Sequence, residues 1–175
     1  DFDSGSYFCS MFIAFGFVIV MCGFLHFAAP ERKTAGHAAA AFSAVYAAII
    51  LVVYFTQLTT VRLAELTEQA CELLDFQQMG LFFSLDLLGY ALMSLATFFA
   101  GLTVEPKDKP SKWLRALLMI HGVFFISCLI MPMLGVFQAD SPAWIGVAVL
   151  EFWCAYFCPV AALALHYFRG QTEQK

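Results

Sequence analysis

Two carboxylates lie inside long apolar stretches of the sequence, where ionisable side chains are rare. Asp86 lies in a run from about residue 79 to 104, and Glu151 lies in a run from about 143 to 168. A charge near the centre of a bilayer costs roughly 2.5–3.5 kcal/mol on insertion scales, so such residues are functional candidates by default. Two acids at matched depth can share one proton, bind a cation, accept an amine from a ligand or relay protons.

Polar and aromatic side chains on neighbouring runs are expected to surround the two acids. Tyr54 and Gln57 lie at the matching end of another run, and Tyr90 lies one helical turn after Asp86. The predicted ligand- or ion-binding residues are Asp86, Glu151, Gln57, Tyr54, Tyr90, Arg62 and Trp153. In the alternative interpretation, both acids are protonated and form interhelical hydrogen bonds. With 20 phenylalanines in the chain, a hydrophobic or aromatic ligand suits these surroundings better than a sugar.

Histidines are the next candidates, because imidazoles from different helices can ligate haem or a transition metal. His26 and His166 lie near the ends of apolar runs, where they can be ordinary residues of the membrane boundary, and His121 lies inside an apolar run. No run carries two histidines with the spacing of a pair of haem ligands. We therefore predict no metal, haem or other cofactor, keep His121, His26 and His166 as the weaker metal candidates, and expect an internal hydrogen bond for His121.

The sequence contains none of the common catalytic motifs. It has no Walker motif, no H-E-x-x-H, no G-x-S-x-G and no asparagine. Its six cysteines include no C-x2-C pair, and Cys154 and Cys158 are separated by three residues. No catalytic residue is predicted, and a disulfide between Cys9 and Cys71 stays an open alternative.

Composition indicates the environment of these groups. The chain of 175 residues is 62 % hydrophobic and 13 % charged, with a mean hydropathy of +0.80. Soluble domains are about 45–50 % apolar and about 25 % charged, so this chain is predicted to lie in lipid. Its net charge of −4 argues against nucleic acid as a partner.

Five stretches are long enough to cross a bilayer, which takes about 20 apolar residues as a helix. They cover approximately residues 7–29, 36–61, 79–104, 113–137 and 143–168. The predicted fold is therefore an all-α membrane protein, a single domain over residues 1–175 with five transmembrane helices. The chain starts at Asp1 rather than Met, so whether further residues precede it stays an open question.

The distribution of Lys and Arg predicts the orientation, because positive loops stay in the cytoplasm. With the N-terminus outside, the inner segments hold Arg32, Lys33, Lys107, Lys109, Lys112, Arg115, Arg169 and Lys175. The outer segments hold only Arg62, so the count is eight against one. We predict an external N-terminus and a cytoplasmic C-terminus in a plasma membrane, such as the bacterial inner membrane.

The connection at residues 62–78 alternates apolar and acidic positions at helical spacing. Its apolar positions are Leu63, Leu66, Ala70, Leu73 and Leu74, and its acidic positions are Glu65, Glu68, Glu72 and Asp75. This pattern predicts an amphipathic outer helix between the second and third spans. Its acidic face is either an ordinary solvated surface or a collar that gathers cations.

Polar residues at helical spacing predict which side of each span faces inward. The expected inward stripes are Ser43, Tyr46, Tyr54 and Gln57; Asp86, Tyr90, Ser94, Thr97 and Gly101; His121, Phe125, Cys128, Pro132 and Gly135; and Glu151, Cys154, Cys158 and Ala162. Pro132 and Pro159 are expected to kink their helices.

Three functional classes remain open from the residues alone. The first is a protein that binds or transports a small hydrophobic or cationic ligand, or an ion, through an outward-facing polar pocket. The second is a non-catalytic accessory or sensor subunit, either in a homo-oligomer or with a partner membrane subunit. The third is a haem or redox membrane protein. An enzyme is not expected.

Overall fold

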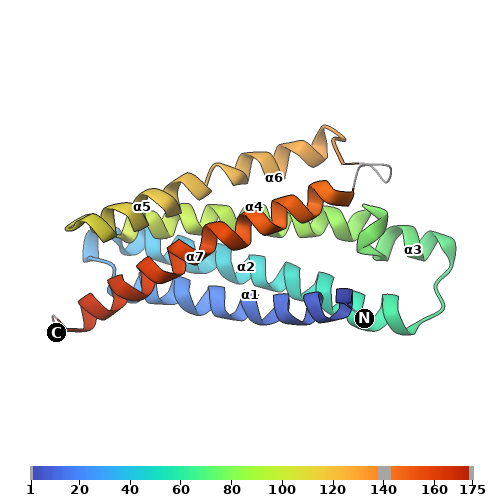
Figure 1. Ribbon diagram of the computed structural model, residues 1–175, viewed down its shortest axis with the longest axis horizontal. Helices are drawn as coiled ribbons and strands as arrows, with labels where there is room; N and C mark the ends of the chain where they lie inside the picture. The colour runs from blue at the N-terminus through green and yellow to red at the C-terminus, as the bar shows by residue number, and fades with distance from the viewer. Residues whose placement is uncertain (1, 138–142, 174–175) are drawn as a thin grey trace.

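The computed structural model describes residues 2–137 and 143–173, and this part of the chain is a bundle of helices without strands (Figure 1). Within these described ranges there are seven α-helices, and short turns and brief helical segments connect α1 to α6. Their bounds are α1 Phe2–Phe27, α2 Lys33–Thr56, α3 Glu68–Leu74, α4 Leu81–Thr103, α5 Lys109–His121, α6 Phe124–Met133 and α7 Ala143–Glu173. The brief segments are η1 Pro30–Arg32, η2 Gln57–Val61 and η3 Phe76–Gln78. The predicted all-α fold is confirmed.

Several of these helices have the length and composition of membrane spans. Among the described residues, four qualify: Ser4–Phe27, Pro30–Val61, Leu81–Thr103 and Lys109–Met133. They coincide with the first four predicted spans and indicate a membrane protein. The fifth predicted span falls on α7, whose 31 residues extend over about 46 Å at 1.5 Å per residue.

Helix α4 lies at the centre of the arrangement and contacts α1, α2, α5 and α6. Figure 1 shows α1, α2 and α4 along the long axis, with α7 crossing them obliquely. The N-terminus and α3 lie at one end of the bundle, and the C-terminus lies at the other, near the start of α5. Any site inside the bundle is therefore built around α4.

Two groups of buried apolar side chains hold the helices together. One lies at the end with the C-terminus and includes Phe24, Leu118 and Tyr167. The other lies between α1, α2 and α4 and includes Ile50 and Met93. Polar side chains of α2 and α4 are buried as well, among them Ser43, Ser94 and Thr97, so the interior of the bundle is partly polar.

The bundle end at the α1–α2 connection is fixed by cationic side chains. The Lys33 ammonium group donates to the carbonyl oxygens of Leu25, at 2.7 Å, and His26, at 3.0 Å. These carbonyls lie at the end of α1, where a helix leaves acceptors without partners. Arg32 and Arg115 both donate to the carbonyl oxygen of Val104 after α4, at 3.0 and 3.3 Å.

Helix α5 starts with a capping box at the same end. The Ser111 amide donates to the Asp108 carboxylate at 2.8 Å, and the Asp108 amide donates to the Ser111 hydroxyl at 3.0 Å. The hydrogen bonds from Ser111 hold the pKa of the Asp108 carboxyl below its usual value. Pro110 occupies the first turn, where its missing N–H has no cost.

The connection between α2 and α4 is less helical than its pattern predicts. The predicted amphipathic helix over residues 62–78 is reduced to α3, of seven residues, and the short segment η3. Two side chains interrupt it: Thr67 caps the start of α3, and Asp75 accepts from the Gln77 amide at 3.0 Å. Short polar side chains compete with helix continuation by such local hydrogen bonds.

The fourth predicted span, residues 113–137, is divided into α5 and α6. The Gly122 amide donates to Met119 O at 3.1 Å and the Val123 amide to Ile120 O at 3.0 Å, so the chain tightens to three residues per turn. Gly122 lies close to α4, since an added Cβ would be 2.8 Å from the Cβ of Phe98. Beyond this break, α6 rises away from the bundle axis (Figure 1).

Candidate functional site

Polar groups from four helices meet inside the bundle. We call them the interior polar cluster: Tyr54, Asp86, Tyr90, Thr97, His121 and Trp153. Five of the six members are buried, with exposed fractions of 6 % for Tyr54, 5 % for Asp86, 0 % for Thr97 and His121, and 7 % for Trp153. The cluster therefore lies in surroundings from which bulk water is excluded, where polar groups require partners.

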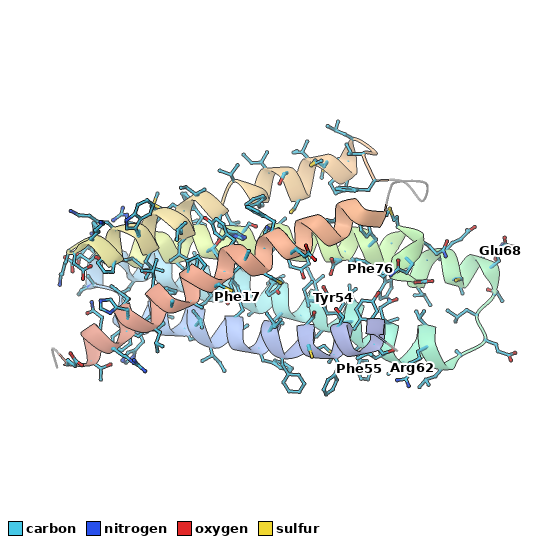
Figure 2. The ribbon with its side chains drawn as sticks, viewed as in Figure 1. Phe17, Tyr54, Phe55, Arg62, Glu68 and Phe76 are labelled. Atoms are coloured by element: carbon cyan, nitrogen blue, oxygen red, sulfur yellow. The ribbon has the colours of Figure 1, made fainter. Side chains whose placement is uncertain are left out.

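Asp86 lies beside two hydrogen-bonded tyrosines. The hydroxyl oxygens of Tyr54 on α2 and Tyr90 on α4 are 3.0 Å apart. The Tyr54 hydroxyl also interacts with the Asp86 carboxyl. Figure 2 shows Tyr54 between the helices and not on the outer surface. The Oδ1 atom of Asp86 is nevertheless buried without a hydrogen-bond partner.

His121 is oriented by a hydrogen bond to α4. Its Nδ1 lies 2.8 Å from the Thr97 hydroxyl oxygen. With its hydrogen directed to Ser94 O at 2.7 Å, that hydroxyl accepts from His121 Nδ1–H, and we assign this tautomer to His121. In a neutral imidazole this leaves Nε2 as an acceptor with a free lone pair. The Nε2 atom is buried and has no partner.

Trp153 connects the two parts of the cluster. Its ring centroid lies 4.4 Å from that of Tyr90 and 5.9 Å from that of His121. Phe124 packs perpendicular to it at 5.9 Å. Its indole Nε1–H, a donor only, is also buried without a partner.

These three atoms give the cluster an unsatisfied hydrogen-bonding capacity. An unpartnered buried polar group costs about 1–3 kcal/mol, so the three together cost about 3–9 kcal/mol. Native proteins fill such positions with water or a ligand, or use them for function. An acceptor at Asp86, a donor at Trp153 and an acceptor at His121 together can bind a polar molecule.

The inward stripes predicted for α2 and α4 are confirmed. Ser43, Tyr46, Tyr54 and Gln57 are buried on α2, and on α4 Asp86, Ser94, Thr97 and Gly101 are buried while Tyr90 is half-buried. These side chains face one another across the α2–α4 contact. The polar pattern of these two spans therefore shows correctly which faces meet.

The stripe predicted for α7 is wrong, because Glu151, Cys154, Cys158 and Ala162 are all exposed. The face that packs inward instead carries Trp153, Val160, Ala164 and Tyr167. Large aromatic and aliphatic side chains bury more apolar area than the Glu and Cys stripe would. Glu151 is consequently not brought to Asp86, and the predicted pair of acids does not form.

Gln57 uses both polar atoms of its side chain on the α3 connection. Its Nε2 donates to Leu74 O at 2.8 Å, and its Oε1 accepts from the Phe76 amide at 3.1 Å. The amide therefore holds the connection against the end of α2. This position explains the burial of Gln57 without a ligand.

Arg62 is far from the interior polar cluster. Its side chain is exposed, and Figure 2 shows it at the bundle end near α3, on the outside. Glu68 projects from the tip of the same end. Neither residue approaches Asp86, so Arg62 does not act as its counter-ion in this conformation.

The remaining histidines lie at the opposite end of the bundle from α3. His26 contacts the Phe27 ring at 4.8 Å, and His37 Nδ1 lies 2.7 Å from Lys33 O. His166 is exposed near the end of α7. In the described part of the chain, no three His, Cys, Asp or Glu side chains gather around a common point that suits a metal ion.

The cysteines are free thiols, including Cys9 and Cys71. Cys71 contacts the carboxylate of Asp75, with an S–O distance of 3.9 Å. The disulfide that the sequence left open is therefore not formed.

The internal hydrogen bond expected for His121 is confirmed, but the sequence did not identify Thr97 as its partner or show that the predicted site residue Trp153 lies beside His121. The sequence contains one signal for the first, since Gly122 directly after His121 permits the close approach of α5 to α4 that the pair requires. Nothing in the periodicity of α7 identifies Trp153 as a neighbour of His121. Comparison with known proteins adds no further assignment: no protein-family model matches the chain, and no curated protein or solved structure is significantly similar to it.

Proposed function

We propose that the chain is a membrane protein with five spans and an external N-terminus that binds a small organic cation in its interior polar cluster. The ligand is bound or transported from the outer half of the bundle. The observation that carries the proposal is the Oδ1 atom of Asp86, a buried carboxylate oxygen without a partner. A positively charged donor is the strongest partner for such an atom.

The surroundings of Asp86 favour an organic ammonium group over a metal ion. Tyr90 lies one helical turn along α4 from Asp86, and its ring packs between Tyr46 and Trp153, with centroid distances of 6.0 and 4.4 Å. An ammonium group over such faces gains cation–π attraction, which is stronger where water is excluded. A metal ion would need several further oxygen ligands.

The ligand is proposed to enter the interior polar cluster past helix α6. None of its residues is buried, and its main contacts are with α4. Its Phe124 ring covers Trp153 and lies 5.3 Å from His121. The break at Gly122 lets α6 move about its junction with α5, and such a movement separates Phe124 from the cluster at little cost in buried area.

A binding experiment with simple probes tests the proposal. Detergent-purified protein is incubated with tritiated 2-phenylethylamine, and bound ligand is measured by scintillation proximity. We expect saturable binding, with the uncharged analogue 2-phenylethanol at least about tenfold weaker as a competitor, since a charge-assisted hydrogen bond contributes about 1.5–3 kcal/mol. Asp86→Asn removes the charge and is expected to abolish binding.

The matched control is Glu151→Gln, which makes the same chemical change at an exposed carboxylate of α7. This variant is expected to bind the amine as the wild type does. Absence of saturable binding, or equal binding by Asp86→Asn and wild type, contradicts the proposed site. Loss of binding in Glu151→Gln alone would place the site on the other face of α7.

A further inference from the structure

We infer that the ligand carries a hydroxyl group in addition to its ammonium group, and that this hydroxyl binds between His121 Nε2 and Trp153 Nε1. The inference rests on the proposed function and specifies its ligand as an amphipathic amino alcohol. Both nitrogen atoms are buried and unpartnered, and they belong to different helices, α5 and α7.

The hydrogen-bonding roles of the two nitrogens are opposite. Trp153 Nε1–H can only donate. His121 Nε2 is an acceptor, because Thr97 receives the hydrogen of Nδ1 while its own hydrogen is directed to Ser94 O. One hydroxyl satisfies both atoms, by accepting from Trp153 and donating to His121. A carbonyl oxygen satisfies only Trp153, and an ammonium group satisfies only His121.

In the described part of the chain, the tyrosine hydroxyls whose rings contact Trp153 and His121 already have other partners. The Tyr90 hydroxyl, from the ring that contacts Trp153, lies 3.0 Å from the Tyr54 hydroxyl. The Tyr156 hydroxyl, from the ring that contacts His121, donates to Leu117 O at 2.6 Å. We assign the hydroxyl between the two nitrogens to the bound ligand, and the competition experiment below distinguishes it from a buried water molecule.

The ammonium site at Asp86 and the hydroxyl site between Trp153 and His121 lie at different levels along α4. Tyr90, which contacts Trp153, lies four residues beyond Asp86, and Thr97, which holds His121, lies eleven residues beyond it. At 1.5 Å per residue these levels are about 6 and about 16 Å from that of Asp86. The ammonium and hydroxyl groups therefore lie at opposite ends of the ligand, with an apolar middle part against the Tyr90 ring.

Three phenylethylamines test this inference by competition with tritiated 2-phenylethylamine. Tyramine adds a hydroxyl at the far end of the ring, and 4-methoxyphenethylamine adds an oxygen that accepts but cannot donate. We expect tyramine to compete at least about tenfold better than 2-phenylethylamine, because its hydroxyl satisfies two buried groups. The methoxy compound is expected to compete far less well than tyramine.

The variant His121→Phe keeps an aromatic ring and removes the acceptor. We expect it to lose the preference for tyramine over 2-phenylethylamine, which is a ratio of two affinities in the same protein and does not require that the absolute affinity stays unchanged. Thermal unfolding and gel filtration show whether this variant folds like the wild type. If it does not fold, the competition of the three amines on wild-type protein tests the hydroxyl site alone.

Two results overturn the inference and leave the proposed function intact. If Asp86-dependent binding persists but the three amines compete equally, a water molecule and not a ligand hydroxyl fills the position. If the methoxy compound equals tyramine, His121 Nε2 takes no part. If no amine binds in an Asp86-dependent way, the proposed function itself fails.

Discussion

Replacement of Gln57 by leucine tests whether one buried amide holds the α2–α4 connection. The change keeps a side chain of similar volume and removes a donor to Leu74 O at 2.8 Å and an acceptor for the Phe76 amide at 3.1 Å. Gln57 is only 5 % exposed, so water cannot easily replace it. Two backbone groups are left without partners, at about 1–3 kcal/mol each, and the expected loss of stability is about 2–6 kcal/mol.

The effect is measured as thermal unfolding of the purified protein, together with hydrogen exchange of the Phe76 amide. Exchange of this amide is expected to accelerate, while amides in the middle of α4 keep their protection. Gln78→Leu is the matched control, because Gln78 is exposed and its replacement removes no buried hydrogen bond. If Gln57→Leu unfolds like this control and the Phe76 amide stays protected, the reasoning is refuted.

Asp108→Ala is expected to lower the unfolding temperature at neutral pH. The folded state lowers the pKa of Asp108, so the difference in unfolding temperature between wild type and variant is fully present above the unfolded pKa of about 4. This difference disappears as the pH falls through the folded pKa. Gly36→Ala places a Cβ atom 2.9 Å from the Cα of Leu25 in α1, and it is expected to destabilise the protein by about 1–3 kcal/mol in chemical denaturation. In the control Gly16→Ala the added Cβ has no atom within 4 Å, so the stability of the protein is expected to stay the same or rise. Thr97→Val is expected to abolish the preference of His121 for the Nδ1–H form, which nitrogen-15 NMR of labelled histidine measures; an unchanged tautomer would contradict the assignment.

The positions of the helices follow from the sequence because lipid imposes a simple rule. Every backbone polar group in a bilayer must be paired within the segment, so each long apolar run becomes a helix. Residues 62–78 lie outside this rule. There Thr67 and Asp75 offer local hydrogen bonds that compete with the helix, and periodicity alone carries no information about that competition.

The site was predictable where polarity decides the inward face. On α4, the only way to shelter Asp86, Ser94 and Thr97 together is to turn them to the bundle interior. On α7, polarity misleads, because Glu151 and the cysteines are outweighed by the packing of Trp153 and the aromatic residues near it. Which of the two faces of α7 packs inward depends on the shape of the neighbouring helices, and the sequence of α7 alone does not contain that information.

Gln57 shows a second limit of such reasoning. A buried amide near a buried carboxylate is a reasonable ligand-binding candidate, and its burial agrees with that prediction. Its actual partners, Leu74 O and the Phe76 amide, are main-chain groups 17 and 19 residues away. The residue types in a sequence do not show which main-chain N–H and C=O groups a turn leaves without backbone partners, so the partners of Gln57 could not be predicted.

The convergence of Arg32 and Arg115 on the carbonyl oxygen of Val104 makes the two ends of the bundle unequal in stiffness. At that end, two guanidinium groups hold the α1–α2 connection and α5 to the end of α4, at a depth where phosphate groups of lipids can surround them. At the other end, the amide of Gln57 holds the α2–α4 connection. For a chain that spans a bilayer, we expect a change in bilayer thickness to be absorbed at the end that carries α3, while the arginine end keeps its level relative to the lipid phosphates.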